Sequence, residues 1–141
     1  LVDLPGYGYA KAGKEEIARW NKLIEDYLRG RSNLRRVCLL IDARRGIGAP
    51  DRKVMELLDK AAVVYQIILT KVDKEKAGAL AKIQATAALE VGRHGAAYPD
   101  IMVTSSAKKT GLAEVRAACA ALAETTSAET TSAETNVTEE Q

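Results

Sequence analysis

Four short apolar runs alternate with segments of helical spacing, and this alternation restricts the fold more than any other feature of the chain. The apolar runs lie at residues 1–4, 36–43, 63–69 and 101–104. Apolar residues three or four positions apart follow each run, at residues 14–30, 50–61, 75–91 and 112–122. Because such spacing places one stripe on a helix, the order β-α-β-α-β-α-β-α is predicted. That order favours an α/β fold with a mostly parallel sheet, right-handed crossovers and helices on both faces.

Two of the predicted strands consist almost entirely of apolar residues. Residues 37–41 read Val-Cys-Leu-Leu-Ile, and residues 63–69 are rich in β-branched side chains. Continuous apolar runs are typical of central parallel strands that are covered on both faces. Pro50 suits the first turn of a helix, and Gly92 suits a helix end.

The net charge of +2 at pH 7 is the sum of two unequal parts. Residues 124–141 hold five of the 19 acidic residues and none of the 21 basic ones, so residues 1–123 carry 21 basic and 14 acidic residues, a balance of +7. This balance is compatible with a polyanionic partner such as RNA, and equally with solvated Lys and Arg side chains. The five-residue string Thr-Thr-Ser-Ala-Glu occurs twice in succession from residue 125. We therefore predict one domain over 1–123 and a disordered acidic tail over 124–141.

Several classes of protein are disfavoured by composition. No apolar run approaches the roughly 20 residues that span a bilayer, and no leader segment is recognisable. The cysteines, Cys38 and Cys119, lie in apolar patterns without metal-ligand spacing, as is typical of core residues in a reducing cytoplasm. His94 is the only histidine, so a zinc site or a catalytic triad lacks the necessary residues. Gly6-Tyr7-Gly8 and Gly46-Ile47-Gly48 lack the third glycine of a dinucleotide fingerprint, which disfavours an oxidoreductase.

Polar motifs follow the predicted strands at their carboxyl ends, where open α/β sheets bind ligands. After the first run, Asp3 and Gly6 form Asp-x-x-Gly, in which the carboxylate suits Mg²⁺ and the glycine lets a backbone N–H approach a phosphate. The same pattern also occurs in ordinary turns.

The third and fourth runs end in motifs that suit a guanine base. In Thr70-Lys71-Val72-Asp73, a carboxylate on a tight loop suits the two N–H donors of guanine, which adenine lacks. The stem of Lys71 suits the base plane, although an aspartate here is equally a helix N-cap. In Ser105-Ser106-Ala107-Lys108, the Ala107 N–H suits the guanine carbonyl, and Ser106 is expected to brace the Asp73 loop. The alternative is a plain βα turn.

Together these motifs resemble those of the EngB-type (YihA/YsxC-like) bacterial GTPases. The resemblance covers roughly residues 1–123 and is most specific in Asp3-Leu4-Pro5-Gly6-Tyr7-Gly8-Tyr9-Ala10, with Asp42-Ala43-Arg44-Arg45-Gly46 and the two guanine motifs in the same order. It implies a P-loop NTPase-type, Ras-like three-layer α/β/α fold.

The resemblance also implies a function and a set of site residues. Such proteins bind GTP with Mg²⁺, assist assembly of the large ribosomal subunit and are linked to cell division and septation. Asp3 would face the metal through water, Gly6 would sense the γ-phosphate, and Asp73 would read guanine. Thr70, Lys71, Ser105, Ser106 and Ala107 would complete the base pocket. Ribosomal RNA would be a partner, with Arg29, Arg31, Arg35 and Arg36 as one candidate patch, and a cytoplasmic monomer is expected.

The phosphate-binding loop of such proteins is the missing motif. The near-match Gly8–Glu15 ends in Glu15, where Gly-x-x-x-x-Gly-Lys-[Ser/Thr] places the hydroxyl that binds Mg²⁺. We therefore expect the true loop and the first switch upstream of Leu1, which would leave the fold incomplete at its N-terminus and nucleotide binding weak. Tyr7 occupies the position where many GTPases carry a water-orienting Gln, so hydrolysis is expected to be slow. The alternative to a GTP-binding protein is a degenerate RNA-binding or ribosome-binding module that no longer uses nucleotide.

Overall fold

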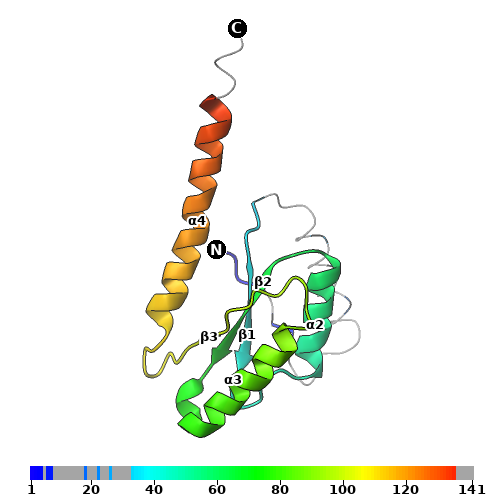
Figure 1. The fold of residues 1–141 in the computed structure, drawn as a ribbon, viewed down its shortest axis with the longest axis vertical. Coiled ribbons are helices and arrows are strands. Elements are labelled where there is room, and N and C mark those ends of the chain that lie inside the picture. Colours follow the sequence, from blue (N-terminus) through cyan, green and yellow to red (C-terminus); the bar gives the residue numbers. More distant parts are fainter. Residues whose placement is uncertain (5, 8–17, 19–21, 23–25, 27–32, 136–141) are drawn as a thin grey trace.

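The computed structural model describes residues 1–4, 6, 7, 18, 22, 26 and 33–135 (Figure 1). The elements, in chain order, are β1 (Val37–Asp42), α2 (Ala49–Lys60), β2 (Tyr65–Thr70), the 3₁₀ turn η1 (Val72–Lys74), α3 (Ala77–Val91), β3 (Met102–Val103) and α4 (Leu112–Thr135). The order of alternating strands and helices predicted from residue 36 onward is confirmed.

Within the described residues, the sheet is parallel and has the order β1-β2-β3. Asp42 at the end of β1 pairs in register with Thr70 at the end of β2. Figure 1 shows α2 and α3 on one side of this sheet and α4 on the other. The predicted α/β architecture with helices on both faces is therefore confirmed for this part of the chain.

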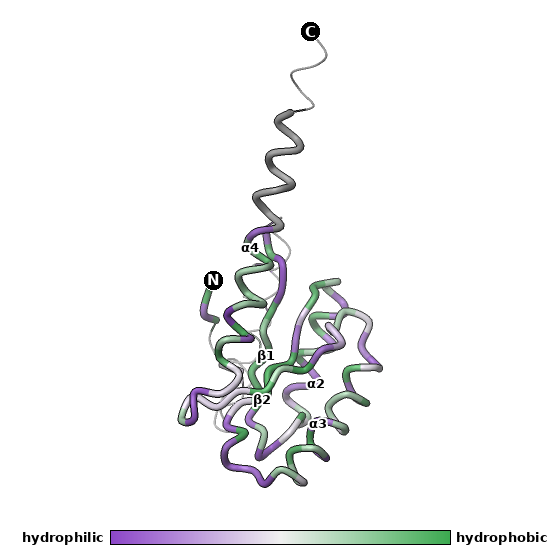
Figure 2. Tube along the Cα trace, turned by 60° about the vertical axis from the view of Figure 1, so that its left-hand side comes forward, coloured by the Kyte–Doolittle hydropathy of each residue, from purple (hydrophilic) through white to green (hydrophobic). Residues whose placement is uncertain are grey.

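The hydrophobic core lies between the sheet and the helices α2 and α3. Figure 2 shows the apolar strands at the centre, surrounded by polar loops. The fully buried core side chains come from β1, β2 and α2. They include Ile41, Met55, Leu58, Tyr65, Ile67 and Leu69.

The prediction that β1 is covered on both faces is wrong for the described residues. Leu39 and Ile41 are buried, whereas Cys38 is exposed and Leu40 is 61% exposed. Side chains alternate across a strand, so β1 is covered on its face toward α2 and α3, and its opposite face is open at Cys38 and Leu40. β2 matches its prediction, because its residues from Tyr65 to Leu69 are all buried.

The N-terminal segment differs in part from its prediction. Residues 1–4 carry no strand in the structure, and Leu1 is fully exposed. The strand predicted at residues 1–4 is therefore absent from the described sheet, of which β1 forms one edge. Of the helix predicted over 14–30, Ala18, Lys22 and Asp26 are helical and exposed, and its apolar stripe lies outside the described residues.

The last helix is longer than predicted. α4 runs to Thr135, through most of the segment predicted to be disordered, and residues 136–141 lie outside the described part. Alanine and glutamate have high helix propensity, and a helix begun at Leu112 needs no new nucleus to continue. The described helices include none that is long and apolar enough to cross a membrane.

Candidate functional site

The candidate site lies at the carboxyl ends of the three parallel strands. β1 ends at Asp42, β2 at Thr70, and the chain after β3 reaches Ser105. In a parallel sheet these ends lie at the same edge. Motifs that are separated by about 30 residues in the sequence thus become neighbours in the fold.

Asp73 and Ser105 form the central contact of the site. The Ser105 hydroxyl donates a hydrogen bond of 2.5 Å to Oδ1 of Asp73. The Lys74 ammonium lies 3.7 Å from Oδ2, and the Asp73 side chain is only 9% exposed. The hydrogen bond from Ser105 holds the pKa of Asp73 below its usual range. Asp73 is therefore an ionised acceptor in a defined orientation, as recognition of two N–H donors requires.

Ser105, and not the predicted Ser106, braces the Asp73 loop. Ser105 is fully buried, whereas Ser106 and Ala107 are exposed on the same turn. The Ser105 hydroxyl also accepts a hydrogen bond of 3.0 Å from the Lys108 N–H. One hydroxyl therefore positions both motifs, and the prediction for Ser106 is corrected to its neighbour.

The Ser105 turn is closed by backbone contacts. The Ser105 N–H donates to the Thr110 carbonyl at 3.0 Å, and the Thr110 N–H donates back at 3.2 Å. Gly111 follows with a φ of +72°, and a Cβ at this position would lie 1.8 Å from the Val103 carbonyl oxygen. Only glycine fits such a close approach of backbone to backbone, so Gly111 sets where the turn lies against β3.

Lys71 belongs to a second cluster at the end of β1. The Lys71 residue has a φ of +58°, and its Nζ lies 3.0 Å from Oδ2 of Asp42. Arg44 binds the same carboxylate with Nε at 2.9 Å and NH2 at 2.5 Å. The hydrogen bonds from Arg44, and then from Lys71, hold the pKa of Asp42 well below its usual range. The Thr70 hydroxyl donates a hydrogen bond to the Ile41 carbonyl at 3.3 Å. This bond links β2 to β1 at the site.

The Asp-x-x-Gly segment is anchored through Tyr7. Asp3 and Gly6 are exposed, and the Tyr7 hydroxyl donates to Oδ1 of Asp51 at 2.9 Å. Burial, with the Asp51 carboxylate, raises the pKa of Tyr7. The structure therefore attaches the segment that carries Asp3 and Gly6 to the first turn of α2, and it brings Asp73, Ser105, Lys71 and Asp42 together at the strand ends.

Asp51 and Arg45 are structural partners that the sequence analysis missed. Asp51 is fully buried, its Oδ2 accepts from the Gly48 N–H at 2.7 Å, and Arg45 lies 2.8 Å from the same oxygen. The sequence does contain a signal for the role of Asp51. This residue stands three positions after the Gly48 N-cap, where a carboxylate caps the first turn of a helix.

Asp3 is the residue of the Asp-x-x-Gly motif that suits a Mg²⁺ ion. This cation keeps several waters and takes one or two carboxylates together with substrate phosphates. The exposed carboxylate of Asp3 suits one such ligand. The described residues hold no group of three or more His, Cys, Asp or Glu that would form a protein cage.

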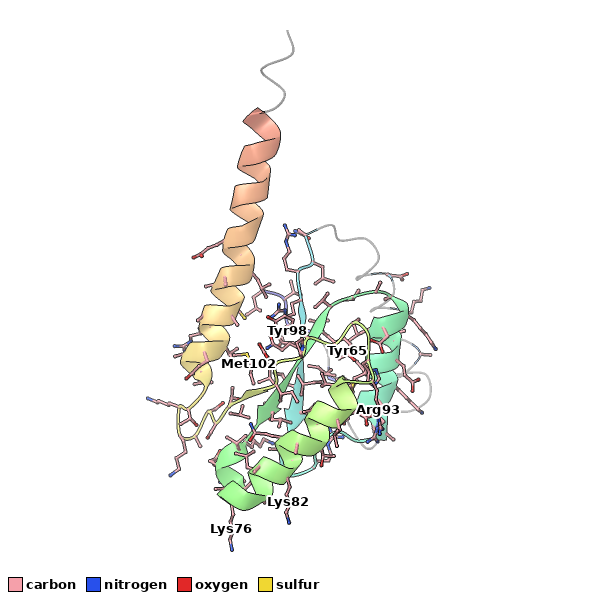
Figure 3. The ribbon with its side chains drawn as sticks, viewed as in Figure 1. Tyr65, Lys76, Lys82, Arg93, Tyr98 and Met102 are labelled. Carbon is pink, nitrogen blue, oxygen red and sulfur yellow. The ribbon has the colours of Figure 1, made fainter. Side chains whose placement is uncertain are left out.

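The candidate arginine patch is only partly open to a ligand. Arg36 donates to Oε1 of Gln66 at 2.8 Å, and its guanidinium lies 3.7 Å from the ring centroid of Tyr98 (labelled in Figure 3). This cation–π contact uses the Arg36 side chain within the fold. Arg29 and Arg31 lie outside the described residues.

Comparisons with known proteins identify similar sequences and similar solved structures. No family model matches the chain. The protein named probable GTP-binding protein EngB in Rhodospirillum rubrum is 55% identical over 123 residues, covering 87% of this chain and 53% of that protein. Its namesake in Rhizobium johnstonii is 54% identical over 120 residues, covering 85% and 55%. The chain thus spans about half the length of the curated relatives it matches.

Solved structures establish the fold. The translation elongation factor SelB of Methanococcus maripaludis, in its apo form, superposes with a TM-score of 0.65 over 86% of this chain and 24% of SelB, at 16% identity. SelB in complex with the GTP analogue GppNHp gives a TM-score of 0.60 over 74% of this chain and 23% of SelB, at 15% identity. The chain therefore has the α/β fold of the matching part of SelB. With 54–55% identity over 85–87% of its length, the chain is a homologue of the curated proteins named probable GTP-binding protein EngB.

Proposed function

We propose that the chain forms the guanine-reading part of a GTP-binding protein. The observation that carries this proposal is the Asp73–Ser105 contact, which holds an ionised carboxylate at the carboxyl ends of the strands. In the proposal, Asp73 accepts hydrogen bonds from N1–H and the exocyclic amino group of guanine, and Ala107 donates its N–H to the guanine carbonyl. The exposed Ala107 and Ser106 backbone is accessible for this role. Adenine offers neither donor to Asp73, which would leave a carboxylate unpaired at a cost of about 1–3 kcal/mol.

The phosphate side of the site is proposed to use the Asp-x-x-Gly segment. Asp3 would bind Mg²⁺ through a water molecule, and the Gly6 N–H would meet the γ-phosphate. The metal, when bound, would neutralise charge on the phosphates. Tyr7 donates its hydroxyl to Asp51 and has no amide to orient an attacking water, which supports slow hydrolysis.

The biological role is proposed from the family. We infer that the complete protein is cytoplasmic and assists assembly of the large ribosomal subunit, with a link to cell division and septation. The basic balance of residues 1–123 supports a partner rich in phosphate, such as ribosomal RNA. Within the described residues, Lys76 at the N-cap of α3 and Lys82 within α3 project into solvent (Figure 3) and are better placed for such contacts than Arg36.

Base selectivity tests the nucleotide proposal. GDP and ADP are titrated into the ¹⁵N-labelled chain while amide shifts of residues 70–74 and 105–111 are followed. We expect weak binding, because the chain contains no Gly-x-x-x-x-Gly-Lys-[Ser/Thr] motif, and a preference for GDP of about tenfold or more. Asp73→Asn replaces one acceptor with an amide donor, which suits the C2 oxygen of xanthine. This variant should therefore prefer xanthosine diphosphate.

The matched control is Asp100→Asn, which changes an exposed aspartate outside the strand ends and should leave the preference for GDP unchanged. Equal shifts with GDP and ADP, or an Asp73→Asn variant that still prefers GDP, would contradict the assignment of Asp73.

A further inference from the structure

The two cysteines of the chain lie on the same side of the sheet, one on β1 and one on α4. Cys38 lies on β1 with its side chain exposed, and Cys119 lies on α4 with its side chain partly exposed. Both line one surface groove of about 220 Å³, together with Leu1, Arg35 and Leu122. Residues that are far apart in the sequence therefore share one small space between β1 and α4.

The two thiols are neighbours in this groove. The Cys119 side chain contributes to the raised pKa of the Cys38 thiol, and both cysteines are free. Disulfide formation requires the two β-carbons to lie close together, and two side chains that line one small groove are suitably placed for it. A bond between them would join α4 to the edge strand, on the face where Leu40 stays exposed.

Accessibility and charge determine how this pair would react. Cys38 is the more exposed thiol, so an oxidant in solution reaches it first. Burial, with the neighbouring Cys119, raises the pKa of Cys38, and Arg36 opposes this effect. Since the thiolate is the reactive form, oxidation of the pair by a peroxide should be slow at neutral pH and faster at higher pH.

We propose that Cys38 and Cys119 are a redox site, in which a peroxide converts the thiol pair to a disulfide that fastens α4 to β1. The Cys38 thiolate attacks one oxygen of hydrogen peroxide, which breaks the O–O bond, forms Cys38 sulfenic acid and releases hydroxide. The Cys119 sulfur then attacks the sulfenic sulfur, which forms the S–S bond and releases water. In total, two thiols and one peroxide yield one disulfide and two water molecules, and an added dithiol reverses the change.

The disulfide would stabilise the fold against thermal unfolding. It would close a loop from residue 38 to residue 119, which contains α2, β2, η1, α3 and β3. A cross-link over so long a loop restricts the unfolded chain. The oxidised chain should therefore unfold at a higher temperature than the reduced chain.

The test uses the full chain at low micromolar concentration, treated with hydrogen peroxide and then with an excess of iodoacetamide. We expect a monomer that has lost about 2 Da and takes up no alkyl group, because both hydrogens of the thiol pair are removed. Digestion should yield a peptide pair linked between Cys38 and Cys119, and dithiothreitol should restore two alkylation sites. The melting temperature should rise on oxidation and fall again on reduction.

Cys119→Ser and Cys38→Ser are the matched controls, with folding checked by circular dichroism. Cys119→Ser should show sulfenic acid at Cys38, detected with dimedone, and no oxidative rise in melting temperature. Dibromobimane, which bridges two nearby thiols, should link the pair in the reduced wild type and in neither variant, which tests proximity without an oxidant. Independent oxidation of the two cysteines, disulfides between molecules in place of the internal one, or absence of the bimane bridge would overturn the proposal.

Discussion

At the scale of single residues, Asp51 joins three separate parts of the candidate site. Its buried carboxylate accepts from the Gly48 N–H and from the Tyr7 hydroxyl, and it pairs with Arg45. These partners come from the start of α2, the Asp-x-x-Gly segment and the loop after β1. Asp51 therefore couples the expected phosphate side of the site to the helix layer.

Asp51→Asn tests this coupling. The substitution keeps the shape of the side chain. It removes the negative charge that lies against Arg45 and the first turn of α2. We expect a loss of about 1–3 kcal/mol in the free energy of unfolding, measured in urea. Glu56→Gln, at an exposed position of the same helix, should change that free energy by less than about 0.5 kcal/mol. An equal effect of the two substitutions would show that Asp51 contributes no more than a surface charge.

At the scale of elements, the turn between β3 and α4 determines the shape of the guanine side. Ser105 and Thr110 exchange two backbone hydrogen bonds, and Lys109 and Gly111 both have positive φ. The turn packs against β3 so closely that Gly111 leaves no room for a side chain. The position of Ser105 beneath Asp73 thus depends on the backbone conformation of the whole turn.

Gly111→Ala tests the role of this turn. The added methyl group meets the Val103 carbonyl and occupies a positive-φ position, so we expect a loss of about 2 kcal/mol or more in the free energy of unfolding. Gly78→Ala is the matched control, because Gly78 lies in α3 with open space around it. That change should stabilise the chain by up to about 1 kcal/mol. If Gly111→Ala were as stable as Gly78→Ala, the close approach to Val103 would be wrong.

At the scale of the whole molecule, two carboxylates at the strand ends make stability depend on pH. The pKa of Asp42 is held down by Arg44 and Lys71, and that of Asp73 by Ser105. A folded pKa below the unfolded value means that the unfolded chain binds more protons between the two values. The stabilisation is then complete above the unfolded value of about 3.9 and is lost as pH falls toward the folded value.

We therefore expect the free energy of unfolding to fall as pH drops below about 4. Urea titrations between pH 7 and pH 3 measure this dependence. Asp42→Asn removes one contributor, so the variant should be less stable at pH 7 and its stability should fall less steeply with acid. Parallel pH profiles for the variant and the wild type would show that Asp42 has no such role.

Much of the fold was predictable because its causes are local. Apolar runs and helical spacing identified β1, β2, α2 and α3 to within a few residues. The prediction failed where a segment needs a partner: residues 1–4 are apolar enough for a strand but pair with none of the described strands. It also failed for α4, where the helix extends beyond its last apolar residues.

The candidate site was predictable in its motifs but not in its contacts. The positions of Asp73 and the Ser105–Ala107 turn followed from where the strands end. The choice of Ser105 over Ser106 did not, because it depends on which hydroxyl the turn directs toward Asp73.

The sequence by itself therefore determined the alternation of strands and helices, the charge of residues 1–123 and the order of the motifs. Each of these follows from composition or from residues that are close together in the chain. Only the tertiary structure decided that Ser105 orients Asp73, that Asp51 holds Tyr7 and that Cys38 and Cys119 line one groove. Each of these contacts joins residues more than 30 positions apart. Their partners are selected by the packing of whole elements, which no local pattern in the chain encodes.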